Sequence, residues 1–130
     1  MAPQATDPGG ANAEGTYATS AGVPSGSSAK DAFDARYLET YGTAAGVLSG
    51  FTWFGYDASA VLAAAVKEVA IEGADGTLYI PRAALTAAVR GTKDFQGLTG
   101  TITCGDTGEC NATGPAVFEV KDGAFVNYGE

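Results

Sequence analysis

The chain has 130 residues and a formal net charge of −8, because 15 Asp and Glu outnumber 7 Lys and Arg. It contains no cluster of basic residues of the kind that binds phosphate backbones, so we expect no nucleic-acid partner. No segment approaches the roughly 18 consecutive apolar residues that a membrane-spanning helix needs. The length leaves room for one domain.

The first 13 residues are rich in Gly, Ala and Pro, and we expect a flexible lead there, with the folded part at residues 14–130. This start has neither the basic nor the apolar region of a signal peptide. An exported parent protein would therefore carry its signal in sequence that is not present here. Thr16, Tyr17 and Thr19 favour a short extended segment after the lead.

Two helices are predicted next. In residues 29–41 an aromatic and leucine stripe recurs at helical spacing, Ser27 or Ser28 can cap the start, and Gly42 can end the helix. The second helix is predicted to run from about residue 54 to about Glu72. Its apolar residues keep a period near 3.6 over four turns, and its many alanines imply close packing against a sheet or another helix. Asp57, near its start, is expected to interact with the helix dipole.

The second half of the chain alternates turns with short elements. Residues 77–80 are predicted to be extended, and Pro81 is expected at the first position of a helix that Gly91 ends. A β-branched strand is predicted over residues 98–103. Two further strands, at 116–121 and 124–128, flank Asp122-Gly123, the preferred pair for a type I′ hairpin turn. The fold class is therefore α/β: three helices plus short strands and a C-terminal β-hairpin.

Cys104 and Cys110 are the only two cysteines, in the segment Cys-Gly-Asp-Thr-Gly-Glu-Cys. The five residues between them include two glycines and can fold back, so we predict a disulfide; the alternative is a pair of free thiols in a cytosolic protein. A disulfide would place the chain outside the cytosol. Two thiolates without a histidine seldom hold zinc, and we expect neither a metal nor a cofactor.

Five short motifs occur in an order and spacing that resemble one family. They are Ala13-Glu-Gly-Thr-Tyr-Ala-Thr, Phe33-x-x-x-Tyr-x-x-x-Tyr-Gly, Tyr56-Asp-Ala, the segment from Pro81 to Gly100 that ends in Phe-x-Gly-x-Thr-Gly, and the hairpin Val-Phe-Glu-Val-Lys-Asp-Gly-Ala-Phe-Val. Together they resemble the C-terminal portion of the periplasmic solute-binding proteins of branched-chain amino acid-type ABC importers. Those proteins are roughly two and a half to three times as long as this chain.

The resemblance implies a partial lobe of a two-lobed periplasmic binding protein fold. It also implies that the three helices belong to one lobe and that the C-terminal hairpin returns to the other. The strands that form the centre of the first lobe's sheet would be missing from this chain. We therefore expect the fragment to need a homo-oligomer to cover its apolar helix faces.

The resemblance also points to ligand-binding residues. The aromatic at the position of Phe51 faces the cleft in family members, and Trp53 lies beside it in the sequence. Tyr17 could contribute a phenolic hydroxyl. The structural alternative is that these side chains are ordinary core or rim residues.

The sequence lacks histidine, the commonest general base, and contains no nucleophile elbow or phosphate loop, so we expect no enzyme. By resemblance the parent would be a periplasmic or extracellular receptor that delivers an amino acid or similar small solute to an ABC permease. The alternative is a self-contained secreted structural or interaction domain that binds no small molecule.

Overall fold

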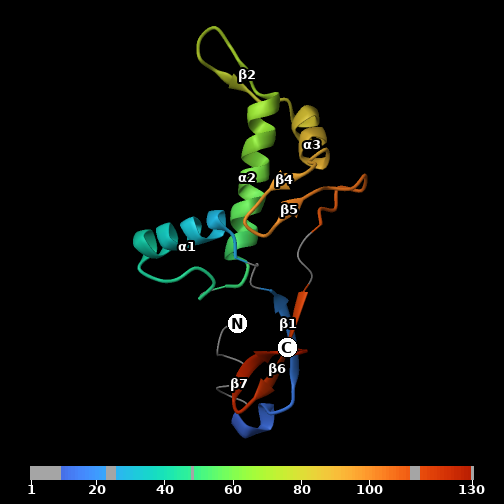
Figure 1. Ribbon diagram of the computed structural model, residues 1–130. Helices are drawn as coiled ribbons and strands as arrows, with labels where there is room; N and C mark the ends of the chain where they lie inside the picture. Colours follow the sequence, from blue (N-terminus) through green and yellow to red (C-terminus); the bar gives the residue numbers. More distant parts are fainter. Residues whose placement is uncertain (1–9, 23–25, 48, 112–114, 130) are drawn as a thin grey trace. The chain divides into compact units, whose positions relative to one another are not determined.

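A computed structural model describes residues 10–22, 26–47, 49–111 and 115–129 (Figure 1). The chain divides into two compact units, where its length suggested room for one. Unit 1 comprises residues 1–53 and 113–130, and unit 2 comprises residues 54–112. Of the predicted flexible lead, residues 1–9 lie outside the described residues, and Gly10–Ala13 form a short 3-10 helix, η2.

Unit 1 contains an antiparallel sheet of three strands in the order β1-β6-β7. Its strands are β1 (Tyr17–Ala21), β6 (Pro115–Lys121) and β7 (Ala124–Asn127). Asp122 and Gly123 both have positive φ angles, 52° and 72°, as the predicted type I′ turn requires. The register pairs Tyr17 with Glu119 and Val120 with Phe125. The predicted C-terminal hairpin is confirmed, and Val120 on its central strand is buried.

Helix α1 (Ser28–Tyr41) also belongs to unit 1 and has the predicted caps. The Ser27 side chain accepts a hydrogen bond from the Lys30 N–H, and Gly42 ends the helix in the left-handed conformation. No residue of α1 is buried. Its aromatic stripe contacts itself instead: the rings of Phe33 and Tyr37 lie 5.7 Å apart, and those of Tyr37 and Tyr41 lie 4.7 Å apart.

Unit 2 contains most of helix α2 (Thr52–Val69). The prediction that this helix continues to Glu72 was wrong, because Ile71 and Glu72 form strand β2 (Ile71–Glu72) instead. This strand pairs with β3 (Leu78–Tyr79) across the predicted Asp75-Gly76 turn. Strand pairing with β3 therefore keeps Ile71 and Glu72 out of α2, although helix propensity alone would have included them.

Helix α3 (Arg82–Arg90) begins one residue later than expected, because Pro81 is extended and forms the N-cap. The predicted strand over residues 98–103 was too long. Only β5 (Thr101–Ile102) is extended, and it pairs with β4 (Phe95–Gln96). The Gly97 N–H donates to the Gly100 carbonyl at 2.9 Å and closes a tight turn that takes Leu98 out of the strand.

The three helices are divided between the two units. Helix α1 shares unit 1 with the C-terminal hairpin, whereas α3 and all but two residues of α2 belong to unit 2. Few apolar side chains of the described residues are buried in either unit: Trp53 and Val120 in unit 1, and Val61, Ala65, Leu98 and Cys104 in unit 2. Among the described residues, no helix is both long and apolar enough to cross a membrane.

Candidate functional site

Phe51 lies in the tight turn that leads into α2. The Ser49 hydroxyl accepts a hydrogen bond from the Phe51 N–H at 3.1 Å, and the Ser49 carbonyl accepts one from the Thr52 hydroxyl at 2.8 Å. Ser49 therefore fixes the backbone on both sides of Phe51. The Phe51 side chain is 63% exposed, so the turn presents a large apolar ring at the surface of unit 1.

Trp53, two residues further on, has the opposite environment. It is 4% exposed, and its indole Nε1 donates to Asp34 Oδ1 of α1 at 2.7 Å. Lys30 bonds to the other carboxylate oxygen of Asp34 at 2.6 Å and lies 4.9 Å from the centre of the Trp53 ring. The ring also packs against Gly46, where an added Cβ would come within 2.5 Å of the indole. Trp53 thus anchors the start of α2 to α1.

The charge of Asp34 is stabilised by this arrangement. Loss of solvent around its carboxylate acts to raise its pKa. The hydrogen bonds from Lys30 and Trp53 and the positive charge of Lys30 together outweigh that effect, and the pKa of Asp34 is lowered. The carboxylate is therefore held ionised between an ammonium group and an indole N–H.

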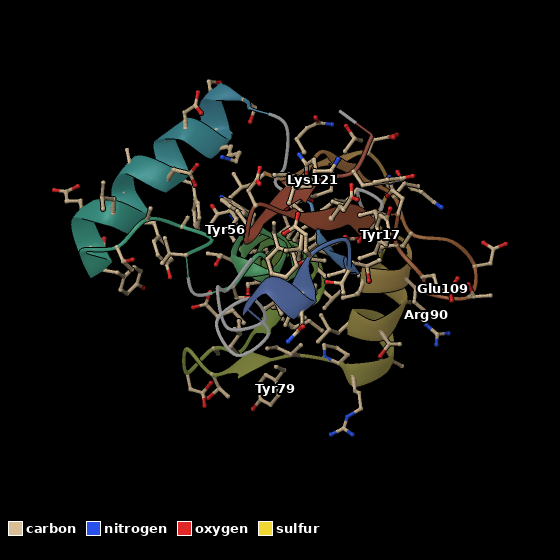
Figure 2. The ribbon with its side chains drawn as sticks, turned by 90° about the horizontal axis from the view of Figure 1, so that it is seen from below. Tyr17, Tyr56, Tyr79, Arg90, Glu109 and Lys121 are labelled. Carbon is tan, nitrogen blue, oxygen red and sulfur yellow. A yellow bond between two sulfur atoms is a disulfide. The ribbon has the colours of Figure 1, made fainter. Side chains whose placement is uncertain are left out.

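Tyr17 belongs to a separate cluster on the sheet of unit 1. Its hydroxyl donates to Glu119 Oε1 at 3.5 Å, and its ring meets that of Tyr128 edge-on at 5.0 Å. Glu119 also forms an ion pair with Lys121 at 2.9 Å. Figure 2 labels Tyr17 and Lys121 on this sheet. Loss of solvent, the Glu119 charge and Tyr128 all raise the pKa of Tyr17.

The structure does not bring Tyr17 and Phe51 together. Gly50, next to Phe51, lies against the end of β1, where an added Cβ would be 3.3 Å from the Ala21 carbonyl oxygen. Tyr17 is four residues earlier on the same strand, which corresponds to about 13 Å. The three predicted ligand-binding residues therefore lie in different places: Phe51 in an exposed turn, Trp53 in the interior of unit 1, and Tyr17 on its sheet.

Glu14 has a role that sequence reasoning missed. Its carboxylate accepts hydrogen bonds from the N–H groups of Asp122 and Gly123, at 2.9 and 3.3 Å. The glutamate of the Ala-Glu-Gly motif thus caps the type I′ turn of the C-terminal hairpin. The motif itself was the signal, because Glu14 is its only charged residue, but nothing local identifies a partner 108 residues away.

Asp57 also has a different role from the one predicted. It is 2% exposed and accepts three hydrogen bonds from the turn between β4 and β5: the Leu98 N–H at 2.7 Å, the Thr99 N–H at 2.8 Å and the Thr99 hydroxyl at 2.7 Å. The turn lies so close that a Cβ on Gly97 would come within 2.5 Å of the carboxylate. Asp57 therefore joins the Tyr-Asp-Ala motif to the Phe-x-Gly-x-Thr-Gly motif, whereas the helix dipole alone does not explain its burial.

The predicted disulfide between Cys104 and Cys110 is present. It closes a largely exposed segment of unit 2, residues 104–111, which we call the arm. The arm has a second clamp at Asn111. The Asn111 side-chain oxygen accepts from the Thr103 N–H, and its amide nitrogen donates to the Thr101 carbonyl at 2.9 Å. Two separate links, one covalent and one made of hydrogen bonds, thus hold the arm to β5.

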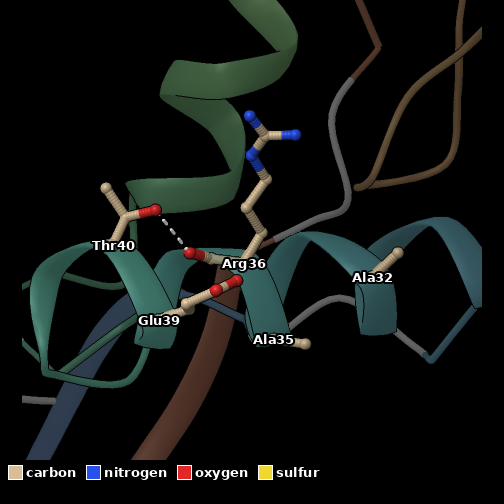
Figure 3. A pocket seen from close by; sticks show the side chains of 5 residues that line it. All are labelled: Ala32, Ala35, Arg36, Glu39 and Thr40. Atoms are coloured by element: carbon tan, nitrogen blue, oxygen red, sulfur yellow. Dashed lines mark hydrogen bonds between the residues drawn. The ribbon is translucent and has the colours of Figure 1, made fainter.

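Neither of two hollows in the described part of the chain is lined by Phe51, Trp53 or Tyr17. The first lies on one face of α1 (Figure 3), and its lining residues are Ala32, Ala35, Arg36, Glu39 and Thr40. The second, of about 310 Å³, is lined by residues of α2, α3 and the segment after α3. The first hollow is formed by a single helix, so it lacks groups that converge on a ligand from several sides. The described residues also hold no group of acidic or cysteine side chains suited to a metal ion.

Comparison with known proteins gives the chain a family. A family model described as periplasmic binding protein matches residues 1–124. The structure is similar to that of a leucine-binding protein, LivK, from Thermotoga maritima, with 25% identity and a TM-score of 0.70, over 98% of this chain and 33% of that one. It also resembles a protein from Rhodospirillum rubrum titled a branched-chain amino acid ABC transporter, with 28% identity and a TM-score of 0.56, over 96% of this chain and 34% of that one.

A third similar structure is the solute-binding protein of an ABC transporter from R. palustris in complex with benzoate. At 24% identity and a TM-score of 0.60, over 95% of this chain and 32% of that one, it supports the fold alone. No curated protein matches the sequence. The chain spans about a third of the length of these solved relatives. The resemblance found in the five motifs is confirmed, and the chain belongs to the periplasmic binding protein family.

Proposed function

We propose that the chain is part of a non-enzymatic receptor outside the cytosol that binds an amino acid or similar small solute and delivers it to the permease of an ABC importer. The observation that carries this proposal is the family match over residues 1–124, together with the structural likeness to a leucine-binding protein. The Cys104–Cys110 disulfide supports a periplasmic or extracellular location, since such bonds persist in oxidising compartments.

Within this function, Phe51 is the residue that contacts the apolar part of the solute. It is exposed, it is held by Ser49, and an aromatic ring offers a large contact area at a low cost in conformational entropy. Trp53 takes part by anchoring the turn that carries Phe51, and it contacts a solute only if that turn opens. Tyr17 offers a phenolic hydroxyl at a second position of unit 1.

The isolated chain should bind free leucine, isoleucine or valine weakly or not at all. A solute cleft needs polar groups that converge from two sides, and the described residues supply no such arrangement around Phe51. Nuclear magnetic resonance of the labelled chain with leucine at millimolar concentrations tests this. We expect small shifts confined to residues 49–54, which Phe51→Ala abolishes and the control Tyr56→Ala, an exposed aromatic on α2, leaves intact.

Two results would contradict these expectations for the isolated chain. Micromolar binding would require a complete pocket that the structure does not provide. Leucine shifts that Phe51→Ala leaves unchanged would remove Phe51 from the site.

We also propose that the chain forms a homo-oligomer. Several large apolar side chains of the described residues remain exposed, and burying them is worth about 25 cal/mol per Å². Those in unit 2 with more than two fifths of their surface exposed are Tyr56, Leu62, Ile71, Leu78, Tyr79 and Ile80. Contact with another copy of the chain would remove this surface from water.

A further inference from the structure

The two cysteines of the arm lie directly opposite each other in a short hairpin. Two backbone hydrogen bonds join the residues that flank them, from the Gly105 N–H to the Glu109 carbonyl at 2.7 Å and from the Asn111 N–H to the Thr103 carbonyl at 3.0 Å. In antiparallel strands, a residue pair that lies between two such bonds has its side chains close together. These bonds do not involve the sulfur atoms, so they can hold Cys104 and Cys110 together when the disulfide is open.

The two cysteines differ in their access to solvent. Cys104 is 1% exposed. Its N–H donates to the Thr92 carbonyl at 2.9 Å, and its carbonyl accepts a hydrogen bond from the Lys93 ammonium. Cys110 is exposed, as is every residue between the two cysteines, and Figure 2 shows its neighbour Glu109 projecting outward. A molecule in solution can therefore reach Cys110, whereas Cys104 lies in the interior of unit 2.

We propose that Cys110 is a site of thiol–disulfide exchange, at which a small thiolate from solution opens the disulfide while unit 2 stays folded. The attacking sulfur forms a bond with Cys110 Sγ, the bond between Cys104 and Cys110 breaks, and its electron pair leaves with the Cys104 sulfur, which takes a proton from water. A second thiolate can then attack the external sulfur of this mixed disulfide and free Cys110. Two external thiols are thereby oxidised to a disulfide as the two cysteines are reduced.

Access and charge both favour attack at Cys110 over attack at Cys104. Exchange depends on which sulfur a thiolate can approach, and the Cys110 end of the bond is the exposed one. Cys104 is then the leaving group. The Lys93 ammonium that binds its carbonyl places a positive charge beside it, and such a charge favours the thiolate form of a cysteine. This charge offsets the cost of forming a thiolate at a buried position.

The contacts of the arm also favour closure of the bond. The Asn111 side chain forms hydrogen bonds with two backbone groups in and next to β5. Arg90 packs so closely against the tip of the arm that a Cβ on Gly108 would be 3.2 Å from its Nε. None of these contacts uses a sulfur atom. They hold the freed Cys104 opposite the mixed disulfide at Cys110, so its thiolate attacks at a high effective concentration and restores the bond.

Two single-cysteine variants of the whole chain test which sulfur reacts. Cys104→Ser leaves Cys110 as a free thiol on the exposed arm, and Cys110→Ser leaves Cys104 as a free thiol in the interior. With oxidised glutathione, Cys104→Ser should form the mixed disulfide at least about tenfold faster than Cys110→Ser, as followed by mass spectrometry. Both variants lack the disulfide, so each is the matched control for the other. Equal rates in variants that circular dichroism shows to be folded would overturn the assignment of Cys110.

The wild-type chain tests whether exchange occurs without unfolding, and this measurement does not depend on how the cysteine variants fold. Reduced glutathione should open the disulfide at a rate that urea leaves unchanged, as long as the urea concentration is too low to unfold the chain. Free thiols are counted by mass spectrometry after they are blocked with a maleimide. A rate that rises in step with the unfolded fraction would overturn the proposal, because only unfolded chains would then react.

Asn111→Ala tests the part that the arm takes in closure. In a buffer of reduced and oxidised glutathione, the ratio of disulfide to dithiol should fall by about threefold or more in this variant, because the lost hydrogen bonds lower the effective concentration of the two thiols. Asp106→Ala, at an exposed position of the same arm, is the control and should keep the wild-type ratio. A wild-type ratio in Asn111→Ala would refute closure by the folded arm.

Discussion

The two units of the chain depend on polar links of different kinds. Unit 1 is held by carboxylates near the surface: Asp34 binds Trp53 and Lys30, and Glu14 caps the hairpin turn. In unit 2 the corresponding carboxylate, Asp57, is buried, and a disulfide closes the arm. With so few buried apolar side chains in either unit, these links take a larger share of local stability than in a domain with a large core. The difference predicts that the stability of unit 2 is sensitive to replacement of single side chains, and that the stability of unit 1 is sensitive to pH.

The largest expected effect is at Asp57. Asp57→Ala leaves two backbone N–H groups and a hydroxyl without their acceptor in the interior of unit 2, which should cost about 3 kcal/mol or more. Hydrogen exchange of residues 95–104 would increase strongly, while the fluorescence of Trp53, the only tryptophan, would change little.

Asp106→Ala, in the exposed arm of the same unit, is the control and should behave as the wild type. Equal hydrogen exchange in both variants would show that the buried carboxylate is not the main link of unit 2. If Asp57→Ala also changed the fluorescence of Trp53 strongly, loss of the link in unit 2 would be shown to disturb unit 1 as well.

The disulfide should give the second effect. Replacing both Cys104 and Cys110 by Ser releases a loop with a sequence separation of 6 residues, for which chain-entropy estimates give about 2 kcal/mol. The midpoint of thermal unfolding of unit 2 should fall, and reductant should lower it only in the wild type. A reductant effect on the double variant would mean that reduction acts elsewhere.

Sequence reasoning succeeded where the determinants were local. The Ser27 side chain caps the start of α1, and the backbone of Gly42 ends the helix. Asp122 and Gly123 form a turn by themselves. These features depend on neighbours within four residues. The disulfide is also nearly local, because its two cysteines are six residues apart and the spacer between them contains two glycines.

Sequence reasoning failed where a residue distant in the chain determines the bounds of an element or the partner of a side chain. The end of α2 is set by the pairing of Ile71 with Tyr79. The start of the predicted strand at 98–103 is lost to the Gly97–Gly100 turn, whose Leu98 N–H donates to the distant Asp57. Glu14 and Asp57 each bind segments 40 or more residues away, so a local pattern could name them but not their partners. For the ligand site, Phe51 was identified by resemblance, and its binding role stays a prediction.

Crowding around Trp53 offers a third comparison. Gly46 has φ 85° and lies against the indole, whereas Gly42 has φ 67° and open space around its missing side chain. Both Gly→Ala substitutions strain the backbone, but only Gly46→Ala also displaces Trp53. We expect Gly46→Ala to destabilise unit 1 by about 1.5 kcal/mol more than Gly42→Ala in urea unfolding followed by Trp53 fluorescence. Equal effects would mean that the indole moves without cost.

The smallest effect concerns acid. The pKa of Asp34 is lowered from its ordinary value of 3.8, so its ionised form is favoured in the folded state. The stability that this link contributes is complete above the unfolded-state pKa and is lost as pH falls through the lower, folded-state pKa. Asp34 is partly exposed, so the contribution should stay below about 1 kcal/mol.

Between pH 5 and about pH 3, wild-type unit 1 should therefore lose slightly more stability than Asp34→Asn, as measured by Trp53 fluorescence in urea. Asp31→Asn, in the first turn of the same helix, should follow the wild type. If Asp34→Asn loses stability in parallel with the wild type, the acid sensitivity of unit 1 does not come from Asp34.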